Sequence, residues 1–349
     1  MNDAKHEKYQ SIGKPITSWK RSPLLFILIF VFLLLPLIIT NPFYLSIVIL
    51  ILFYTFLSLS WNVQGGFVGQ LSLGHAAYAG IGAYTSTVLF MRLNLSPWIG
   101  MWIGGLFAAI IGFAIAYPCT KLRGAYYALG TLAFSLVLKI IIENTNFLGG
   151  AGGLVIPLLK TSPLHFQFLD KKYYYYAILL MLIGVIYISY RIMNSRCGYY
   201  FRAIRNDEDA AKALGINSIR YKILAAMISA FFTGIAGTFY AQFILFISPE
   251  RILDPGLSFQ IAIMAIIGGR GTIAGPILGA FLLVLTSEIT KLLVGGRVMG
   301  AELVLYSLVL MVVIRYRPQG VGGLVTEAYS SIGARFKNGR MKAGQYGNS

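Results

Sequence analysis

The stretch that decides the fold is SRCGYYFRAIRNDEDAAKALGINSIRYKILAAMISAFFTGIAGTFYAQF, residues 195–243. It begins with polar and basic residues and closes in an apolar run long enough to cross a membrane as a helix. Between these parts we expect one short amphipathic helix over residues 202–215, with Asn206 as its N-cap and Gly215 as its left-handed stop. A charged helix of this kind has little use in lipid, so we expect it to dock on another protein.

The charges of this expected helix follow the helix dipole. Asp207, Glu208 and Asp209 fall in the first turn, where negative charge is stabilising. An ordinary polar loop with one helical turn is the alternative interpretation. A small apolar face beside Arg205 and Lys212 is expected from Ile204, Ala210, Ala211 and Leu214. The candidate docking residues are therefore Arg202, Arg205, Asn206, Asp207, Glu208, Asp209, Ala210, Ala211, Leu214 and Gly215.

The composition excludes a soluble domain. Of the 349 residues, 57% are hydrophobic, and they come in runs of roughly 20. We predict an all-α, polytopic transmembrane helical bundle of about ten spans. The spans are expected near residues 24–40, 43–62, 66–90, 97–118, 125–142, 173–191, 221–246, 255–269, 272–294 and 300–316. The expected domains are a basic N-terminal segment at 1–23, a transmembrane domain at 24–317 with a coupling loop at 192–220, and a polar tail at 318–349.

The positive charge is best explained by membrane topology. The net charge is +17, but the basic residues lie between apolar runs and at both ends, without the interleaved aromatic residues of a nucleic-acid surface. With a cytoplasmic N-terminus, most of the 29 Lys and Arg residues fall in inner segments, as the positive-inside rule requires. Both termini and the 202–215 helix are then cytoplasmic. The same bias favours a spanning eighth segment over a re-entrant one.

One long loop, residues 143–172, would face outward. It carries the glycine-rich run GGAGG at 149–153 and precedes an aromatic cluster at the next interface. It is a candidate surface for a delivery protein, and a passive lid is the alternative.

Two predicted spans contain glycine-rich interruptions, one at residues 65–75 and one at residues 268–279. Paired interruptions in corresponding positions of two halves indicate a transport path. Because the interrupted spans lie five helices apart, two inverted five-helix halves are a hypothesis, and close helix packing explains the glycines as well. The path candidates are Gln70, Ser72, Gly74, His75, Gly82, Gly268, Gly269, Gly271 and Gly275.

Few residues suggest chemistry. His75 lies inside the third predicted span, where an ionisable group is a functional candidate by default, although a neutral structural histidine is the commoner case. Glu288 and Lys291 are expected to pair on the ninth helix. No P-loop, zinc-protease or nucleophile-elbow motif is present, and the two cysteines have no metal-ligand spacing. We expect no enzyme activity and no cofactor, so ATP, if used, is bound by another polypeptide.

Several sequence blocks resemble a known family. The run Asp209-Ala210-Ala211 followed by Gly215 is similar to the EAA loop of ABC importer permeases, with Asp in place of the usual Glu. Over residues 24–323 the chain resembles the LivM-type permeases of branched-chain amino acid ABC importers. The blocks that carry this resemblance are GQLSLGHAAYAGIGAY at 69–84, KLRGAYYALGTLAF at 121–134, GGAGG at 149–153, AIRNDEDAAKALGINSIRYKILA at 203–225, ISP at 247–249 and GGRGTIAGPILGA at 268–280.

The resemblance implies an assembly. In such a system this subunit pairs with a second related permease in the inner membrane of a bacterium or archaeon. Two ATPase subunits bind below, and an extracytoplasmic binding protein delivers the amino acid. Because that soluble protein selects the solute, permeases for urea or other amino acids could share the same motifs. A proton-coupled secondary transporter, with His75 or Glu288 as a relay, remains an alternative.

Overall fold

The computed structural model describes residues 32–39, 41–158 and 162–294, together with residues 308, 311 and 315. The chain divides into two compact units, residues 1–45 and residues 46–349. In the first unit, residues 32–38 are helical. The expected segment 1–23, the tenth span at 300–316 and the tail at 318–349 lie wholly or almost wholly outside the described residues, as does part of the first span at 24–40.

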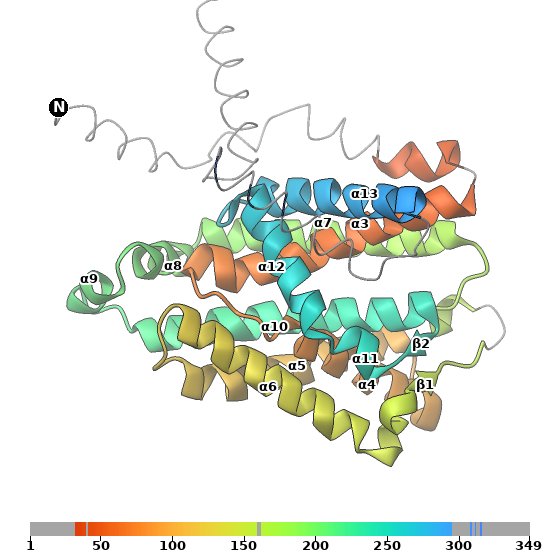
Figure 1. Ribbon diagram of the computed structural model, residues 1–349, viewed down its shortest axis with the longest axis horizontal. Coiled ribbons are helices and arrows are strands. Elements are labelled where there is room, and N and C mark those ends of the chain that lie inside the picture. Colours follow the sequence, from red (N-terminus) through yellow and green to blue (C-terminus); the bar gives the residue numbers. More distant parts are fainter. Residues whose placement is uncertain are drawn as a thin grey trace, which may run out of the picture. The chain divides into compact units, whose positions relative to one another are not determined.

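The described chain from residue 42 to residue 294 is helical, with short 3-10 turns and one pair of strands (Figure 1). The elements are α3 (Pro42–Asn62), the π-helical turn η3 (Val63–Val68), α4 (His75–Leu93), α5 (Pro97–Cys119), α6 (Ala125–Glu143), η4 (Asn146–Leu148), η5 (Gly150–Gly152), β1 (Leu154–Val155), η6 (Pro163–His165), α7 (Lys171–Met193), α8 (Arg196–Asn206), α9 (Glu208–Ala213), α10 (Ser218–Ile244), β2 (Phe246–Ile247), α11 (Pro249–Ile252), α12 (Pro255–Gly269) and α13 (Ala274–Val294).

Seven helices among the described residues are long and apolar enough to cross a membrane. They are α3 with η3, α5, α6, α7, α10, α11 with α12, and α13. The protein is therefore an all-α, polytopic membrane protein, and the count of ten spans stays a prediction. At about 1.5 Å per residue, α12 alone is shorter than a bilayer core, and the turn of α11 before it extends the segment to 21 residues.

The core forms where α4, α5 and α10 pack together. Small residues allow the close approach: a Cβ at Gly82 of α4 would overlap the carbonyl oxygen of Gly234 of α10, and a Cβ at Gly237 would overlap that of Ala79. Without water to drive helices together, such close van der Waals contact is what stabilises membrane bundles. Helix α4 is largely buried in this core, and its polar residues His75, Ser86 and Thr87 are among the buried ones.

A second helix group consists of the middle of α3, around residues 50–54, with α12 and α13. Buried Met264, Ile267 and Leu283 pack together, with Leu50 and Tyr54 of α3 against them. The turn between α12 and α13 is tight, because a Cβ at Gly268 would overlap the Gly275 carbonyl. The second glycine-rich interruption is therefore a turn between two packed helices.

The predicted third span, 66–90, is wrong at its beginning. Residues 63–68 prolong α3 as a π-helical turn, residues 69–74 are not helical, and α4 begins at His75. Side chains replace the missing helical hydrogen bonds: Trp61 Nε1 donates to the Ser72 carbonyl at 2.8 Å, and the Leu73 amide donates to Thr131 Oγ1 at 3.0 Å. Irregular backbone at membrane depth is tolerated when protein groups satisfy it in this way.

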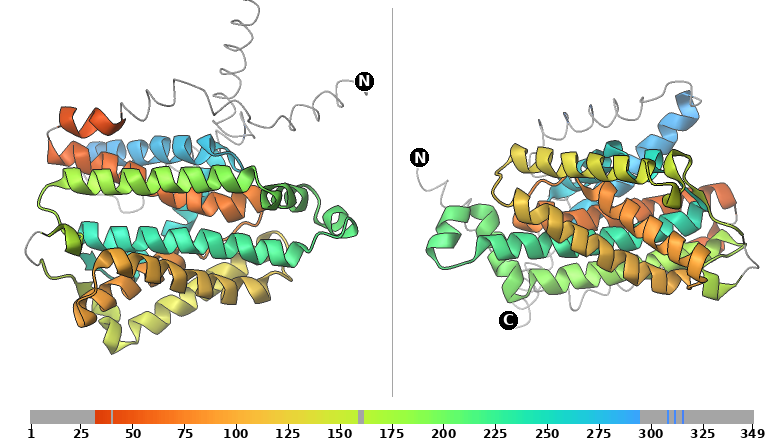
Figure 2. Two further views of the ribbon diagram at one scale, coloured as in Figure 1. Left: turned by 180° about the vertical axis from the view of Figure 1, so that it is seen from behind. Right: turned by 90° about the horizontal axis from the view of Figure 1, so that it is seen from below.

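The two ends of this unit differ. At one end β1 and β2 form a two-stranded antiparallel pair that attaches the 143–172 loop to the segment after α10, with Leu154 opposite Ile247. At the other end α8 and α9 project beyond the ends of α7 and α10 (Figures 1 and 2). The only charged element that stands out from the bundle within the described ranges is therefore α8 with α9.

Candidate functional site

The expected single helix over 202–215 is two helices. Asn206 is the last residue of α8, and Asp207, with extended backbone at φ −156° and ψ 110°, separates α8 from α9. The N-cap of α9 is Asp207 and not Asn206, because the Asp207 carboxylate accepts from the amides of Asp209 and Ala210 at 2.9 and 3.0 Å. The predicted stop at Gly215 is confirmed, with φ +83°.

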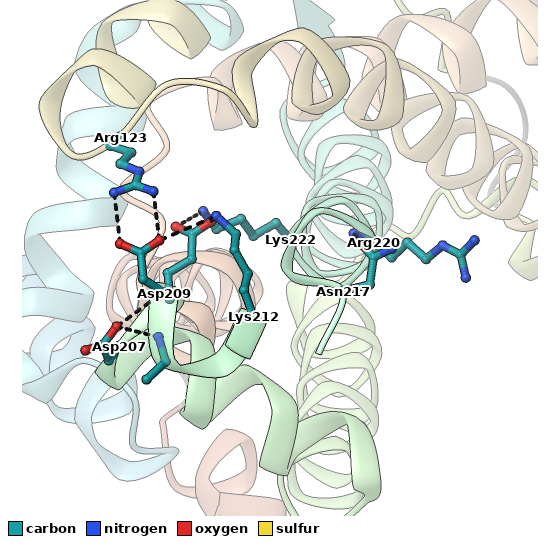
Figure 3. Close-up of polar contacts among 9 residues, drawn as sticks. Arg123, Asp207, Asp209, Lys212, Asn217, Arg220 and Lys222 are labelled. Carbon is teal, nitrogen blue, oxygen red and sulfur yellow. Dashed lines mark hydrogen bonds and ion pairs between the residues drawn. The ribbon is translucent and has the colours of Figure 1, made fainter. Parts of the chain in front are cut away.

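Glu208 anchors α9 to the bundle through Lys222 at the start of α10. Its carboxylate pairs with Lys222 and, at 3.0 Å, with Lys212 (Figure 3). Only 7% of the Lys222 side chain is exposed. Burial by itself would raise the pKa of Glu208, but the two lysines outweigh that effect and hold the pKa below its ordinary value. Glu208 is thus charged and carries a structural ion pair.

Asp209 of α9 faces Arg123 in the link between α5 and α6. Two nitrogens of Arg123 donate to its two oxygens at 3.0 and 3.3 Å, as the fork in Figure 3 shows. This bond lowers the pKa of Asp209 and raises that of Arg123. Both side chains are about two-thirds exposed, at 67% and 65%, so the pair adds little stability in water. A partner that approaches α9 can reach both groups.

The expected apolar face is divided between the two helices. Ile204 of α8 and Ala211 of α9 are buried in one cluster, whereas Ala210 is exposed and Leu214 is 81% exposed. The prediction of one shared face is wrong, because the break at Asp207 turns α9 relative to α8. Leu214 instead projects from the end of α9 beside Gly215, where a Cβ would meet nothing within 4 Å.

Helix α8 lies directly on the π-helical turn η3. Phe201 and Ile204 pack with Val63, Phe67 and Val68 in one buried cluster. π-turns inside helices are rare and occur frequently at functional sites. The element that projects from the bundle is thus in contact with the first glycine-rich interruption.

Arg205 adds a polar contact to this packing. It is an exposed residue overall, yet its Nη1 donates to the carbonyl oxygen of buried Gly66 at 2.8 Å. Burial of the guanidinium end lowers the pKa of Arg205, and the nearby Arg270 and Arg202 lower it further. Arg202 contacts the carbonyls of Gly198 and Met193 and lies over the ring of Tyr199.

The two predicted interruptions meet each other. Asn62, fully buried at the end of α3, donates from Nδ2 to the Thr272 carbonyl and accepts at Oδ1 from the Gly271 amide, both at 2.8 Å. Gly271 has φ +80°, a conformation that glycine adopts without strain. The backbones of the two predicted interruptions are therefore brought to one place, and the Asn62 side chain joins them.

The polar candidates of the first interruption are buried. Gln70 is 8% exposed and its amide donates to the Gln64 carbonyl at 3.2 Å. Ser72 accepts from the Gly74 amide at Oγ, and a Cβ at Gly74 would lie 3.2 Å from the Thr131 carbonyl. These residues stabilise an irregular segment, and their role in a translocation path stays a prediction.

His75 begins α4 and is fully buried. Its Nε2 lies 2.7 Å from Ser229 Oγ, and that hydroxyl donates to the Ser60 carbonyl. Since the Ser229 proton is used there, Nε2 is the nitrogen that donates, and Nδ1 has no hydrogen-bond partner within the described part of the chain. The geometry is that of a neutral histidine joining three helices.

The remaining glycine candidates serve close packing. Gly82 lies against α10, whereas Gly268, Gly269 and Gly275 form the tight turn between α12 and α13. Gly82 is not among the residues that meet around Asn62. Away from these places, Glu288 and Lys291 pair at 2.8 Å as expected.

The sequence reasoning missed two residues that organise the site, Asn62 and Lys222. Both carried a signal: Lys222 is an ionisable residue inside a predicted span, and Asn62 is a carboxamide at the end of one. Arg123 was not predictable in the same way, because its partner Asp209 lies on α9, 86 residues away in the sequence.

The fold and the site together define a polytopic membrane protein with a charged element projecting at one end. No cluster of side chains suited to a metal ion occurs in the described ranges. Residues 43–314 match the family described as branched-chain amino acid transport system / permease component. The chain belongs to this family of ABC transporter permeases.

Individual relatives agree with the family. The chain is 33% identical over 329 residues to the high-affinity branched-chain amino acid transport system permease protein LivM of Escherichia coli (strain K12), covering 84% of this chain and 74% of that protein. It is 25% identical over 250 residues to the permease protein LivH of Salmonella typhimurium, covering 66% and 79%. It is 24% identical over 269 residues to the nucleoside ABC transporter permease protein NupC of Lactococcus lactis, covering 72% and 81%.

All three relatives are named as transport permeases and not as enzymes. Together with the seven apolar helices, they make this chain a multi-pass protein of the inner membrane. No solved structure gives a significant match.

Proposed function

We propose that the chain is the translocation-pore subunit of an ATP-driven ABC importer for the branched-chain amino acids Leu, Ile and Val. It receives mechanical work from separate ATPase subunits through α8 and α9. One observation carries this proposal: a capped, ion-paired α9 projects from the bundle with Leu214 exposed, while α8 behind it packs on the η3 interruption. A movement of α9 and α8 would therefore displace η3, where the membrane helix is irregular.

The proposed ATPase-coupling residues are Arg202, Arg205, Asn206, Asp207, Glu208, Asp209, Ala210, Ala211, Leu214 and Gly215. Leu214 and Asp209 would meet the ATPase directly, because Leu214 is 81% exposed and the Asp209 side chain is 67% exposed. Arg205, Glu208 and Ala211 would transmit the movement, because they contact the bundle.

The proposed topology places α8 and α9 in the cytoplasm, with the loop 192–220 as the coupling loop of a transmembrane domain at 24–317. Both termini, including the segments 1–23 and 318–349, are then cytoplasmic. The β1–β2 end, with the 143–172 loop, faces outward and receives the extracytoplasmic binding protein. This orientation follows from the distribution of Lys and Arg.

The proposed assembly holds two permeases and two ATPases, and the ATPases bind the ATP. Similarity to both LivM and LivH supports a pair of related permeases in one importer. The finer architecture of about ten spans in two inverted five-helix halves belongs to this proposal. The path between inward and outward access would run beside Gln70, Ser72, Gly74, His75, Gly82, Gly268, Gly269, Gly271 and Gly275.

A different solute is the second candidate. The similarity to NupC favours nucleosides as an alternative cargo, and urea or other amino acids would suit the same scaffold. The binding protein selects the solute in such systems, so the permease needs only a passable route. A proton-coupled secondary transporter would instead take up solute without ATP and lose uptake when an uncoupler is added.

Reconstitution tests the proposal. The chain is purified with its bound subunits, placed in liposomes, and supplied with binding protein loaded with leucine, a nucleoside or urea. We expect leucine-loaded protein to raise ATP hydrolysis and solute uptake together. Reversing the charges of Asp207, Glu208 and Asp209 should abolish uptake while the chain still inserts. Uptake by the isolated chain without any ATPase would contradict the proposal.

A further inference from the structure

Three segments that are far apart in the chain meet around the carbonyl oxygen of Gly66. From α8, Arg205 Nη1 donates to this oxygen at 2.8 Å. From α3, the Asn62 carboxamide binds the turn between α12 and α13 twice, at the Gly271 amide and the Thr272 carbonyl. The projecting helix, the first interruption and the second interruption are thus joined by two side chains.

The junction has no free space. A Cβ at Gly66 would overlap Asn62 Oδ1 and lie 2.6 Å from the Gly271 amide nitrogen. A Cβ at Gly271 would overlap Arg205 Nη1 and lie 3.0 Å from the Gly66 carbonyl oxygen, and one at Gly69 would lie 2.9 Å from Arg205 Cγ. Because no gap separates the three segments, none can shift by an ångström without moving or breaking its contacts to the others.

The two side chains have different neighbours. Asn62 is fully buried, and its two hydrogen bonds of opposite sense leave one orientation of the carboxamide. Arg205 is exposed as a whole residue but reaches inward with a charged donor, which forms the stronger class of hydrogen bond. Asn62 therefore holds the two interruptions together, and Arg205 is the link that a movement of α8 acts on.

We propose that Arg205 and Asn62 are positioning residues that make the η3 interruption and the α12–α13 turn move together with α8 during transport. This inference rests on the proposed function, because it assigns the input to the ATPases. Arg205 acts through its contacts with other parts of this chain. It determines how far the movement of α8 in each ATPase cycle also displaces the two interruptions.

The test is the coupling ratio, ATP hydrolysed per solute imported, in liposomes holding the full complex and ligand-loaded binding protein. For Arg205→Ala we expect ATP hydrolysis to stay near the unaltered level while uptake falls about tenfold, the change that loss of one charge-assisted hydrogen bond can cause. Arg205→Lys should restore part of the uptake because it keeps a charged donor. Arg196→Ala, on the same helix, is the matched control, since Arg196 is exposed and its side chain has no hydrogen bond or ion pair among the residues described.

An unchanged coupling ratio in Arg205→Ala would overturn the inference, as would an equal effect in Arg196→Ala. A complex with the unaltered chain that imports nothing with ATP would instead refute the proposed function. The two failures are therefore distinguishable.

Hydrogen exchange provides a readout independent of transport, and serves if Arg205→Ala alters assembly. On ATP binding, we expect exchange to change in peptides covering α8, η3 and residues 268–275 of the unaltered complex. In Arg205→Lys and Arg205→Ala the change in α8 should persist while that in 268–275 shrinks. An undiminished change in 268–275 would show that movement reaches the turn by another route.

Discussion

Replacing Glu208 with Gln should loosen α9 from the bundle while the rest of the protein stays folded. The Glu208 carboxylate pairs with Lys222, and the two side chains are 20% and 7% exposed. A hydrogen bond to a charged group contributes about 1.5–3 kcal/mol. Because Glu208 is partly exposed, we use about 2 kcal/mol, which corresponds to about a 30-fold larger opening constant for α9.

Amide hydrogen exchange measures this opening directly. At pH 7, peptides covering residues 207–216 should exchange about 30-fold faster in Glu208→Gln, whereas peptides from α4 and α10 should not change. Asp209→Asn is the matched control, because Asp209 lies one residue away but pairs with Arg123 in an exposed position. Exchange within twofold of the unaltered protein in Glu208→Gln, or a larger effect in Asp209→Asn, would refute the reasoning.

The protection of α9 from hydrogen exchange should depend on pH in one direction. Burial by itself raises the pKa of Glu208, but Lys222 and Lys212 outweigh it, so the folded value lies below the ordinary 4.5. A carboxyl with a depressed folded pKa contributes its full stability above the unfolded value and loses it as the pH falls through the folded value. After correction for intrinsic exchange rates, protection of α9 should be constant from pH 7 to about pH 5 and fall below about pH 4.5. Glu208→Gln should lack this step.

Three further predictions concern Gly215, Leu214 and Gly82. Gly215→Pro should abolish ATP-driven uptake but not insertion, because proline cannot adopt the φ of +83° at this position; transport and membrane fractionation measure the two effects. Leu214→Ser should reduce co-purification of the ATPase about tenfold without lowering the melting temperature. Leu169→Ser, at the opposite end and 88% exposed, should leave co-purification of the ATPase unchanged. Gly82→Ala should destabilise the protein by about 1–3 kcal/mol, because the new Cβ would overlap the Gly234 carbonyl. Gly184→Ala in α7 is the control and should stabilise the protein slightly, because its Cβ would meet nothing within 4 Å. Equal shifts of the melting temperature in the two variants would contradict the packing account.

Much of the fold was predictable because apolar runs and capping residues act locally. The helices at 97–118, 125–142 and 255–269 were expected within one or two residues of α5, α6 and α12. The third span was not, because glycines allow several backbone conformations and the choice is made by Trp61 and Thr131 from elsewhere in the fold. A sequence window contains no information on such partners.

The candidate site was predictable to a similar degree. The acidic first turn and the Gly215 stop depend on neighbours in sequence, and both are present. The break at Asp207 was missed because Asn206 and Asp207 are both good caps, and the packing of α8 on η3 and α9 on α10 decides between them. Lys222 and Asn62 have partners 14 and about 210 residues away, so their roles require the tertiary structure.

Thiol chemistry on Leu214→Cys tests the central claim most directly, in a chain whose Cys119 and Cys197 have been replaced by serine. In intact cells a membrane-impermeant thiol reagent should leave position 214 unlabelled, and in isolated complexes a short crosslinker should join it to the ATPase subunit. Leu169→Cys, at the other end of the bundle, should show the reverse pattern. Labelling of position 214 from outside, or a crosslink to the ATPase from position 169, would contradict the account.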